Sequence, residues 1–265
     1  MNETELIKTS VLNCRRVDLY VDAVVPTVEQ EEAIRRIRER RREGEPLQYI
    51  LGETDFMGMA FHVNPQVLIP RPETEILVET ALSLVPRGGG TFRILDLGTG
   101  SGNIAVSCAA LLDDALVDSV DIFPEALEVA SGNARKHRMD RKIRFVHNDM
   151  RLFLSAAAAR EPYDMILSNP PYVSSGDLDT LPADVRREPR AALDGGEDGM
   201  AFLKDILSLG PAVLKPGAFL LLEIGDGHSK SLEKYLENNS QFCEYEFKKD
   251  YSGVDRILVA RKSLR

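Results

Sequence analysis

The chain has 265 residues, of which 43% are hydrophobic and 28% are charged, a composition that excludes disordered, collagen-like and disulfide-rich proteins. Its 33 basic and 42 acidic residues leave a formal net charge of −9, which argues against a protein that binds duplex nucleic acid over a broad basic face. The three cysteines lack CxxC spacing and no apolar run is long enough to span a membrane, so we expect a cytoplasmic protein without structural disulfides, metal sites or membrane contact.

The first fifty residues favour helices. A capping box at Thr27 and Gln30 predicts the start of a helix. The charged stretch Glu31–Glu43 continues this helix and ends at Gly44, a residue type that commonly stops helices. Arginines and glutamates are interspersed along the stretch. We interpret its arginine-rich face as a solvated helix surface, with a docking surface as the alternative.

The next segment changes period. Between Phe56 and Ile69 the helical pattern disappears, and the sequence predicts a short hairpin that turns at Asn64 and Pro65. Such a hairpin would connect two domains. A helix is expected at Glu73–Val85.

After Gly90, strand and helix patterns alternate, which predicts an α/β fold with a parallel, doubly wound sheet. The expected strands are Arg93–Gly98, Leu116–Ile122, Ile143–His147, Tyr163–Ser168, Ala218–Ile224, Glu244–Lys248 and Arg256–Ala260. The expected helices are Asn103–Leu112, Pro124–His137, Arg151–Ala159, Gly199–Leu214 and Ser229–Glu237. Ligands of such sheets bind beyond the C-terminal ends of the strands, so the functional residues should lie in the loops there.

The loop after the first strand is rich in glycine and reads Asp96-Leu-Gly-Thr-Gly-Ser-Gly102. Glycine permits strained backbone angles and lets a ligand approach the main chain closely. The GxGxG spacing differs from the GxGxxG of dinucleotide sites, and Asp96 would repel a pyrophosphate but attract a cation. These features favour S-adenosylmethionine, which carries a sulfonium and an ammonium group.

Acidic residues follow the next two strands. Asp121 could accept hydrogen bonds from both ribose hydroxyls, or it could cap the helix that begins near Pro124. Asp149 could accept a hydrogen bond from the adenine amino group or cap the next helix, and Met150 could pack against the ring. The expected cofactor-binding residues are therefore Asp96, Gly98, Thr99, Gly100, Ser101, Gly102, Asp121, Asp149 and Met150.

The fourth strand leads into Asn169, Pro170, Pro171 and Tyr172, which we expect to be catalytic. The prolines stiffen this segment and leave carbonyl groups without competing N–H donors. The Asn169 side-chain oxygen and the Pro170 carbonyl could accept both hydrogens of a planar NH₂ group while Tyr172 packs against its face. Because an amide nitrogen is a poor nucleophile, this grip would promote its attack on a methyl donor. The alternative is a stiff turn without a chemical role.

Together with Leu68-Ile-Pro-Arg-Pro-Glu-Thr-Glu75 and Glu45-Pro-Leu-Gln-Tyr-Ile-Leu-Gly52, these two loops resemble the HemK/PrmC family, the peptide chain release factor N5-glutamine methyltransferases. The resemblance covers nearly the whole chain. It implies a seven-stranded, Rossmann-like, mostly parallel sheet with an antiparallel last strand. The implied reaction is methylation of the side-chain amide nitrogen of the glutamine in the GGQ motif of class I release factors, with S-adenosyl-L-homocysteine as the product.

The resemblance also assigns roles along the chain. It implies a helical N-terminal domain at 1–52 that docks the release factor, a hairpin linker at 53–72 and a catalytic domain at 73–265. The docking domain is shorter than the family usually shows. Asn169 would contact the cofactor, Asn169–Tyr172 would hold the glutamine, and the protein would act as a monomer.

Two further features of the sequence remain open. Arg71 and Glu75 could bind the substrate by helping to close the active site, or they could belong to a proline-bounded helix start. Glu223, near the end of the fifth strand, could be a helix cap or a carboxylate of the pocket.

Two alternative functions deserve comparison. An adenine-N6 methyltransferase acting on nucleic acid could use the same Asn-Pro-Pro-Tyr edge, but it would have to flip the base out. The chain shows neither a separate target-recognition domain nor a basic surplus. A non-enzymatic cofactor-binding regulator would leave this edge without a task.

Overall fold

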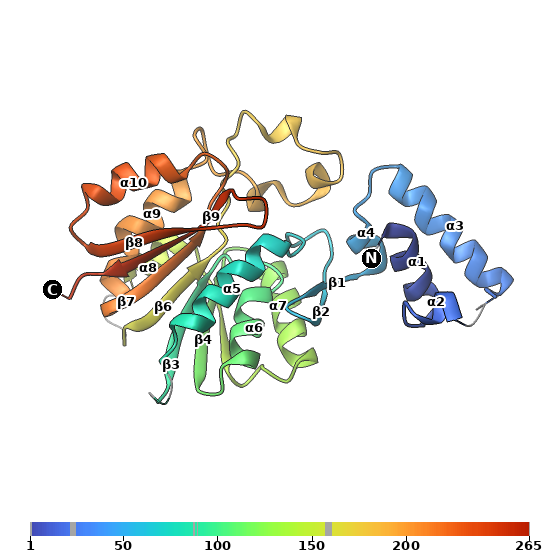
Figure 1. Cartoon of the computed structure of the whole chain (residues 1–265), viewed down its shortest axis with the longest axis horizontal. Helices are drawn as coiled ribbons and strands as arrows, with labels where there is room; N and C mark the ends of the chain where they lie inside the picture. Colours follow the sequence, from blue (N-terminus) through green and yellow to red (C-terminus); the bar gives the residue numbers. More distant parts are fainter. Residues whose placement is uncertain (1, 22–24, 87, 89, 157–160, 265) are drawn as a thin grey trace.

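The computed structural model describes residues 2–21, 25–86, 88, 90–156 and 161–264. Figure 1 shows a group of N-terminal helices beside a larger part that is built on a sheet. None of the helices in the described ranges has the length and apolar character that crossing a bilayer requires.

The N-terminal helices are α1 (Glu3–Leu12), α2 (Asp18–Val21), α3 (Val28–Arg42) and α4 (Leu47–Leu51). The predicted capping box is confirmed, because Thr27 Oγ1 accepts from the Gln30 N–H and the Gln30 side chain accepts from the Thr27 N–H. Arg35 and Arg36 both pair with Glu32 on the exposed side of α3, as expected for a solvated helix face.

The hairpin lies earlier in the chain than predicted. Strands β1 (Glu53–Phe56) and β2 (Met59–His62) pair antiparallel and turn at Met57 and Gly58, which both have positive φ. The predicted turn at residues 64–65 is therefore wrong. A tight hairpin turn requires left-handed backbone angles. Glycine adopts these angles readily, whereas proline cannot, because its φ is fixed near −65°.

The sheet contains β3 (Phe92–Leu97), β4 (Ala115–Asp121), β5 (Ile143–His147), β6 (Tyr163–Ser168), β7 (Leu214–Glu223), β8 (Phe242–Lys249) and β9 (Asp255–Lys262). Its strand order is β5-β4-β3-β6-β7-β9-β8. Only the pairings that involve β9 are antiparallel. This confirms the predicted seven-stranded sheet with an antiparallel last strand.

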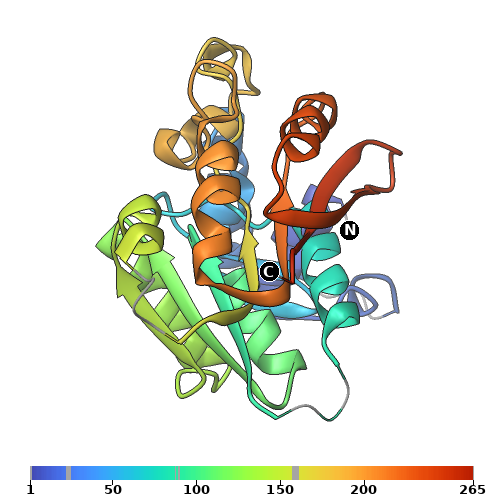
Figure 2. The ribbon, with the colours of Figure 1, turned by 90° about the vertical axis from the view of Figure 1, so that its left-hand side faces the viewer.

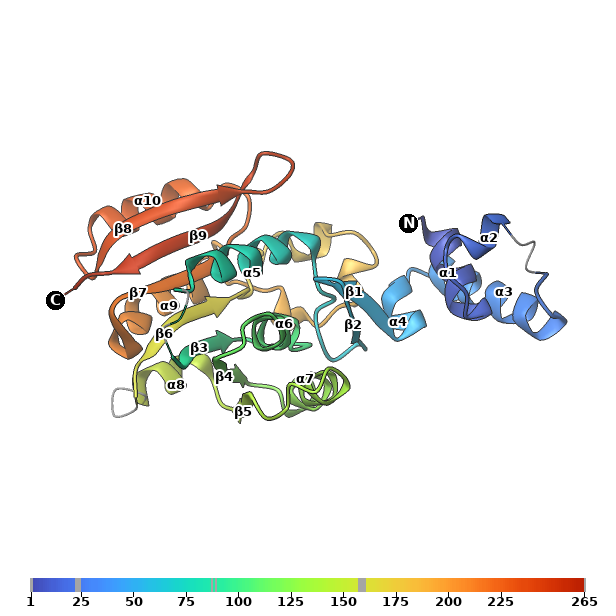
Figure 3. The same cartoon turned by 60° about the horizontal axis from the view of Figure 1, so that its bottom comes forward.

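Helices cover both faces of the sheet (Figure 2; Figure 3). These helices are α5 (Pro72–Leu84), α6 (Asn103–Leu111), α7 (Pro124–Lys136), α8 (Met150–Ala156), α9 (Ala201–Leu209) and α10 (Ser229–Glu237). Successive side chains of a strand point to opposite faces. Accordingly Leu95 and Leu97 belong to a core with residues of α8, α9 and α10, whereas Ile94 packs with residues of α5 and α6.

One predicted helix ends earlier in the structure, and the end of another lies outside the described residues. The helix expected at Gly199–Leu214 is α9 followed by the 3₁₀ turn η5 (Gly210–Val213). Pro211 explains the early end, because proline cannot donate the hydrogen bond that continues a helix. The helix expected at Arg151–Ala159 is α8, and the last residues of that prediction, 157–159, lie outside the described residues.

A long loop connects β6 to α9 and contains the 3₁₀ turns η2 (Leu178–Thr180), η3 (Val185–Arg187) and η4 (Arg190–Ala192). Arg41 of α3 pairs with Asp184 of this loop across 3.1 Å. The loop therefore contacts both the N-terminal helices and the sheet part of the molecule.

Candidate functional site

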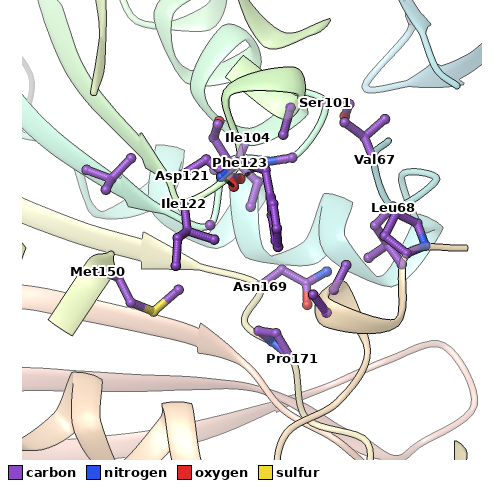
Figure 4. A pocket seen from close by; sticks show the side chains of 18 of the residues that line it. Val67, Leu68, Ser101, Ile104, Asp121, Ile122, Phe123, Met150, Asn169 and Pro171 are labelled. Atoms are coloured by element: carbon purple, nitrogen blue, oxygen red, sulfur yellow. Dashed lines mark hydrogen bonds between the residues drawn. The ribbon is translucent and has the colours of Figure 1, made fainter. Parts of the chain in front are cut away.

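A cavity of about 310 Å³ lies at the C-terminal ends of β3, β4 and β6. This volume is typical of cofactor and small-molecule sites. Figure 4 shows side chains from several loops converging on it. Of the residues predicted to bind cofactor or substrate, the cavity lining includes Gly98, Thr99, Gly100, Ser101, Asp121, Asp149, Met150, Asn169 and Pro171. The lining does not include Asp96, Gly102, Pro170, Tyr172, Arg71 or Glu75.

The glycine loop depends on left-handed backbone angles. Gly98, Gly100 and Gly102 have φ values of 73°, 54° and 79°, which other residues rarely adopt. A Cβ atom on Gly102 would lie only 3.0 Å from Ala130 Cβ, whereas none of the described atoms lies within 4 Å of the position of a Cβ on Gly100. Gly102 is thus required for packing against α7, and Gly100 presents a bare backbone.

Asp121 joins the end of β4 to the glycine loop. Its Oδ2 accepts from the Gly100 N–H at 2.9 Å and its Oδ1 accepts from the Phe123 N–H at 3.0 Å. Burial raises the pKa of this carboxyl, while the backbone donors lower it. Each carboxylate oxygen has a second lone pair, so the residue can still accept hydrogen bonds from a ligand in the cavity.

Asp149 has the capping role that the sequence left open. Its Oδ1 accepts from the Arg151 N–H at 2.7 Å at the start of α8, and the residue also lines the cavity beside Met150.

Ile122 and Phe123 line the cavity as well and are 50% and 44% exposed. The sequence analysis missed this pair. The signal that could have identified them is their position: they form an apolar dipeptide directly after Asp121, the last residue of β4.

Asp96 was predicted to bind the cofactor, but its side chain does not line the cavity. It is fully buried behind the glycine loop, where its Oδ2 lies 3.2 Å from Ser119 Oγ and its Oδ1 has no hydrogen-bond partner among the described residues. Burial raises its pKa to about 7, against the opposing effect of the Thr99 and Ser119 hydroxyls. The side chain lies on the same face of β3 as Ile94, which the period of the strand determines.

Asn169 presents one side of its amide to the protein. Its Nδ2 donates to Thr74 Oγ1 at 3.1 Å, and none of the described residues donates to its Oδ1. Pro171 also lines the cavity, whereas Pro170 is buried behind it. The prediction that Tyr172 packs against a substrate finds no support in this arrangement, because Tyr172 lies outside the cavity lining.

Glu223 is neither a helix cap nor part of the cavity wall. It is 1% exposed, and its carboxylate accepts from Thr74 Oγ1 at 2.6 Å and from the Tyr172 hydroxyl at 3.0 Å. Burial raises the pKa of Glu223, and the two hydroxyl donors lower it. Tyr172 is therefore anchored behind the cavity by a residue more than fifty positions away, which no local pattern indicated.

Arg71 and Glu75 are engaged by other parts of the chain. Arg71 pairs with Glu188, which is almost fully buried and also accepts from the Ile69 N–H at 3.0 Å. Glu75 accepts from the Met57 N–H at 2.6 Å at the hairpin turn. In this structure Arg71 therefore holds the segment before α5 and Glu75 holds the hairpin turn, and neither lines the cavity. The segment before α5 and the first turn of α5 border the cavity through residues that the sequence analysis did not assign: Gln66, Val67, Leu68, Pro70 and Thr74.

Family models and curated relatives match most of this chain. A PrmC N-terminal domain model matches residues 1–52, and a methyltransferase small domain model matches residues 73–194. A release factor glutamine methyltransferase of Geobacter sulfurreducens is 39% identical over 98% of this chain and 88% of the relative. Another, of Rhodospirillum rubrum, is 40% identical over 92% of this chain and 73% of the relative.

A solved structure also shares the fold. The hMettl16 catalytic domain, in complex with the MAT2A 3′UTR hairpin 1, matches with a TM-score of 0.62. The match covers 83% of this chain and 79% of that one at 17% identity. This likeness shows the architecture of the sheet and its helices.

Replacement of the buried acid behind the glycine loop, Asp96→Asn, should change how stability depends on pH. In the folded protein Asp96 has a pKa of about 7, whereas an exposed aspartate titrates near ~3.9. Between these values the unfolded chain releases a proton that the folded protein keeps, so this group makes the folded protein less stable as the pH rises. Asparagine has no such proton.

Urea unfolding of both proteins at about pH 5 and about pH 8 measures this effect. We expect the free energy of unfolding of Asp96→Asn, relative to that of the unsubstituted protein, to be higher at the upper pH. An equal difference at both pH values would show that Asp96 is ionised in the folded protein throughout this range.

Proposed function

Because the chain belongs to the release factor glutamine methyltransferase family, we propose that it methylates the side-chain amide nitrogen of the glutamine in the GGQ motif of class I release factors. The methyl donor is S-adenosylmethionine. The observation that carries the proposal is the position of Asn169, whose amide oxygen accepts no hydrogen bond from the described residues, in the wall of the cavity that the glycine loop also lines.

The residues of the cavity fit S-adenosylmethionine. Gly98 and Gly100 expose backbone without a side chain in the way, and Asp121 offers carboxylate oxygens for the ribose hydroxyls. The apolar side chains of Ile122 and Phe123 suit the flat adenine ring. When bound, the cofactor supplies a methyl group on a positively charged sulfur.

Asn169 and Pro170 would hold the substrate amide. Its nitrogen is a weak nucleophile because the lone pair is delocalised into the carbonyl group. Asn169 lines the cavity wall, and its Oδ1 can accept one N–H hydrogen. For the second hydrogen we propose the carbonyl of the adjacent Pro170, although Pro170 is buried and outside the cavity lining. Two such acceptors would orient the nitrogen and stabilise the positive charge that develops on it. Pro171 and Tyr172 stiffen and anchor this edge, and we keep them in the catalytic segment for that reason.

We also propose the predicted division of the chain, with residues 1–52 docking the release factor, residues 53–72 forming the linker and residues 73–265 forming the catalytic domain. The match of residues 1–52 to the PrmC N-terminal domain supports the first boundary. A substrate that acts in translation supports the predicted cytoplasmic location.

An adenine amino group presents the same planar NH₂ to such an edge. The formal net charge of −9 disfavours a nucleic-acid substrate, whose binding depends on phosphate neutralisation. The fold shared with the hMettl16 catalytic domain carries no information about substrate at 17% identity. The protein amide is therefore the favoured acceptor.

Methyl transfer to alternative acceptors tests the proposal directly. Incubation with radiolabelled S-adenosylmethionine and a class I release factor should label the factor, and mass spectrometry should find one added methyl group on its GGQ glutamine. A factor with alanine in place of that glutamine is the matched control and should stay unlabelled. Label on adenine-containing DNA alone would contradict the proposal.

Loss of the asparagine amide should affect chemistry more than cofactor binding. Asn169→Ala removes an acceptor that acts in the transition state, so kcat should fall by at least ~100-fold. The dissociation constant of S-adenosylmethionine, measured by calorimetry, should change by less than about fivefold. Near-normal turnover would remove Asn169 from the mechanism.

Loss of the Asp121 carboxylate at the end of β4 should, in contrast, weaken cofactor binding. Asp121→Ala should weaken cofactor binding by about 1.5 to 3 kcal/mol, the range of hydrogen bonds to charged groups. Asp118→Asn is a suitable control on the same strand, because Asp118 pairs with Arg144 and lies outside the cavity lining. Calorimetry that finds equal affinity for Asp121→Ala and the unsubstituted protein would contradict the ribose assignment.

A further inference from the structure

We propose that Glu223, acting through Thr74, fixes the orientation of the Asn169 side-chain amide, so that Glu223 and Thr74 are positioning residues of the methyl-transfer site. The effect of this orientation on catalysis rests on the function proposed above. Neither residue belongs to the two motif loops, and they are brought together from α5 and the end of β7.

The chain of hydrogen bonds begins at a buried carboxylate. Glu223 is 1% exposed, and a carboxylate has only acceptor oxygens. Its Oε2 lies 2.6 Å from Thr74 Oγ1 and its Oε1 lies 3.0 Å from the Tyr172 hydroxyl. Both hydroxyl groups must therefore direct their hydrogens at Glu223.

The next link follows from the valence of a hydroxyl group. Thr74 has one hydroxyl hydrogen, and Glu223 takes it. Thr74 Oγ1 can then only accept from Asn169, which places the NH₂ side of the amide, 3.1 Å away, against Thr74. The Asn169 oxygen consequently points away from Thr74, on the side where an incoming amide needs an acceptor.

The opposite orientation would oppose catalysis. A terminal amide is nearly symmetric in shape, and rotation by about 180° exchanges its oxygen and NH₂ positions. The rotated Asn169 would present hydrogens to the hydrogens of the substrate amide and an oxygen to the acceptor oxygen of Thr74. The Glu223–Thr74 pair makes this second orientation unfavourable, which shape alone cannot do.

The orientation argument applies to the ionised form of Glu223. Burial has the largest effect on this carboxyl and raises its pKa. Besides its two hydroxyl donors, the positive charge of Arg256 lowers the pKa of Glu223, against the effects of burial and of the nearby Glu73. Arg256 is itself held by Asp250 across 3.2 Å and donates to the Ile224 carbonyl at 3.2 Å. These contacts fix the position of Arg256, the positively charged group that lowers the pKa of Glu223.

Substitutions at Thr74 separate orientation from packing. Thr74→Val keeps the shape but removes the hydroxyl, so kcat should fall about tenfold or more while KM and cofactor affinity change little. Thr74→Ser restores the hydroxyl and should restore kcat to within about threefold of the unsubstituted value. Glu223→Gln should also lower kcat, because the glutamine NH₂ can donate to Thr74 and release its hydrogen toward Asn169. Equal kcat for the valine and serine variants would overturn the proposal.

A double-substitution cycle shows whether Thr74 acts through Asn169. In an Asn169→Ala background there is no amide to orient, so Thr74→Val should change the residual kcat by less than about twofold. Multiplicative losses in the double variant would mean that Thr74 acts independently, which also overturns the proposal.

Isotope-labelled NMR of the protein without substrate tests the orientation by itself. The Asn169 side-chain amide signals, identified by their absence from Asn169→Ala, should exchange slowly with water in the unsubstituted and Thr74→Ser proteins and quickly in Thr74→Val. Equal exchange in all three would refute the orientation. If slow exchange holds but the unsubstituted protein methylates no release factor, the proposed function fails while the positioning inference stands.

Discussion

The 2.6 Å hydrogen bond from Ser168 Oγ to the Leu97 carbonyl oxygen joins the C-terminal ends of two neighbouring parallel strands. Because β3 and β6 are paired in register at these two residues, the chain leaves them side by side as Gly98 and Asn169. One exit forms the glycine loop and the other holds the acceptor edge. Methyl transfer requires donor and acceptor within bonding reach, and this pairing fixes their relative position before any ligand arrives. The chain runs from β3 outward to β4 and β5 and then returns to β6, so the strand order reverses between β3 and β6. Ligands of such sheets bind at this reversal, and the rest of the site follows from it.

Buried carboxylates organise the loops around that point, and their partners differ in a way that matches their positions. Burial of a charge without compensation is costly. Asp121 is compensated by two backbone N–H groups and Glu223 by two hydroxyls, so each connects two segments of chain. Burial raises the pKa of all three carboxyl groups. Asp96 keeps one oxygen without a partner among the described residues, and burial raises its pKa to about 7. Asp121 and Glu223 each accept from two donors and connect two segments of chain, whereas Asp96 has fewer donors and lies behind the glycine loop.

Local patterns in the sequence predicted what local physics determines. Strand positions, the capping box at Thr27 and the glycine loop follow from side-chain period, helix-end hydrogen bonds and backbone freedom. The hairpin turn was misplaced because Asn64-Pro65 and Gly58 are both turn signals, and only packing chooses between them. Contacts between distant residues, such as Arg71 with Glu188 or Thr74 with Glu223, have no local signature. Their discovery required the fold, and they show what holds Arg71 and Tyr172 in place.

The loop between β6 and α9, which contributes part of the cavity wall, is held from two directions with unequal strength. On one side Glu188, almost fully buried, binds both Arg71 and the Ile69 N–H, and breaking a buried, hydrogen-bonded pair typically costs several kcal/mol. On the other side Arg41 and Asp184 are 27% and 35% exposed, and ion pairs open to water contribute little. This part of the cavity wall is therefore held mainly by its contacts with the segment before α5, through Glu188. The N-terminal helices contact the wall through the weaker of these two pairs, Arg41 with Asp184.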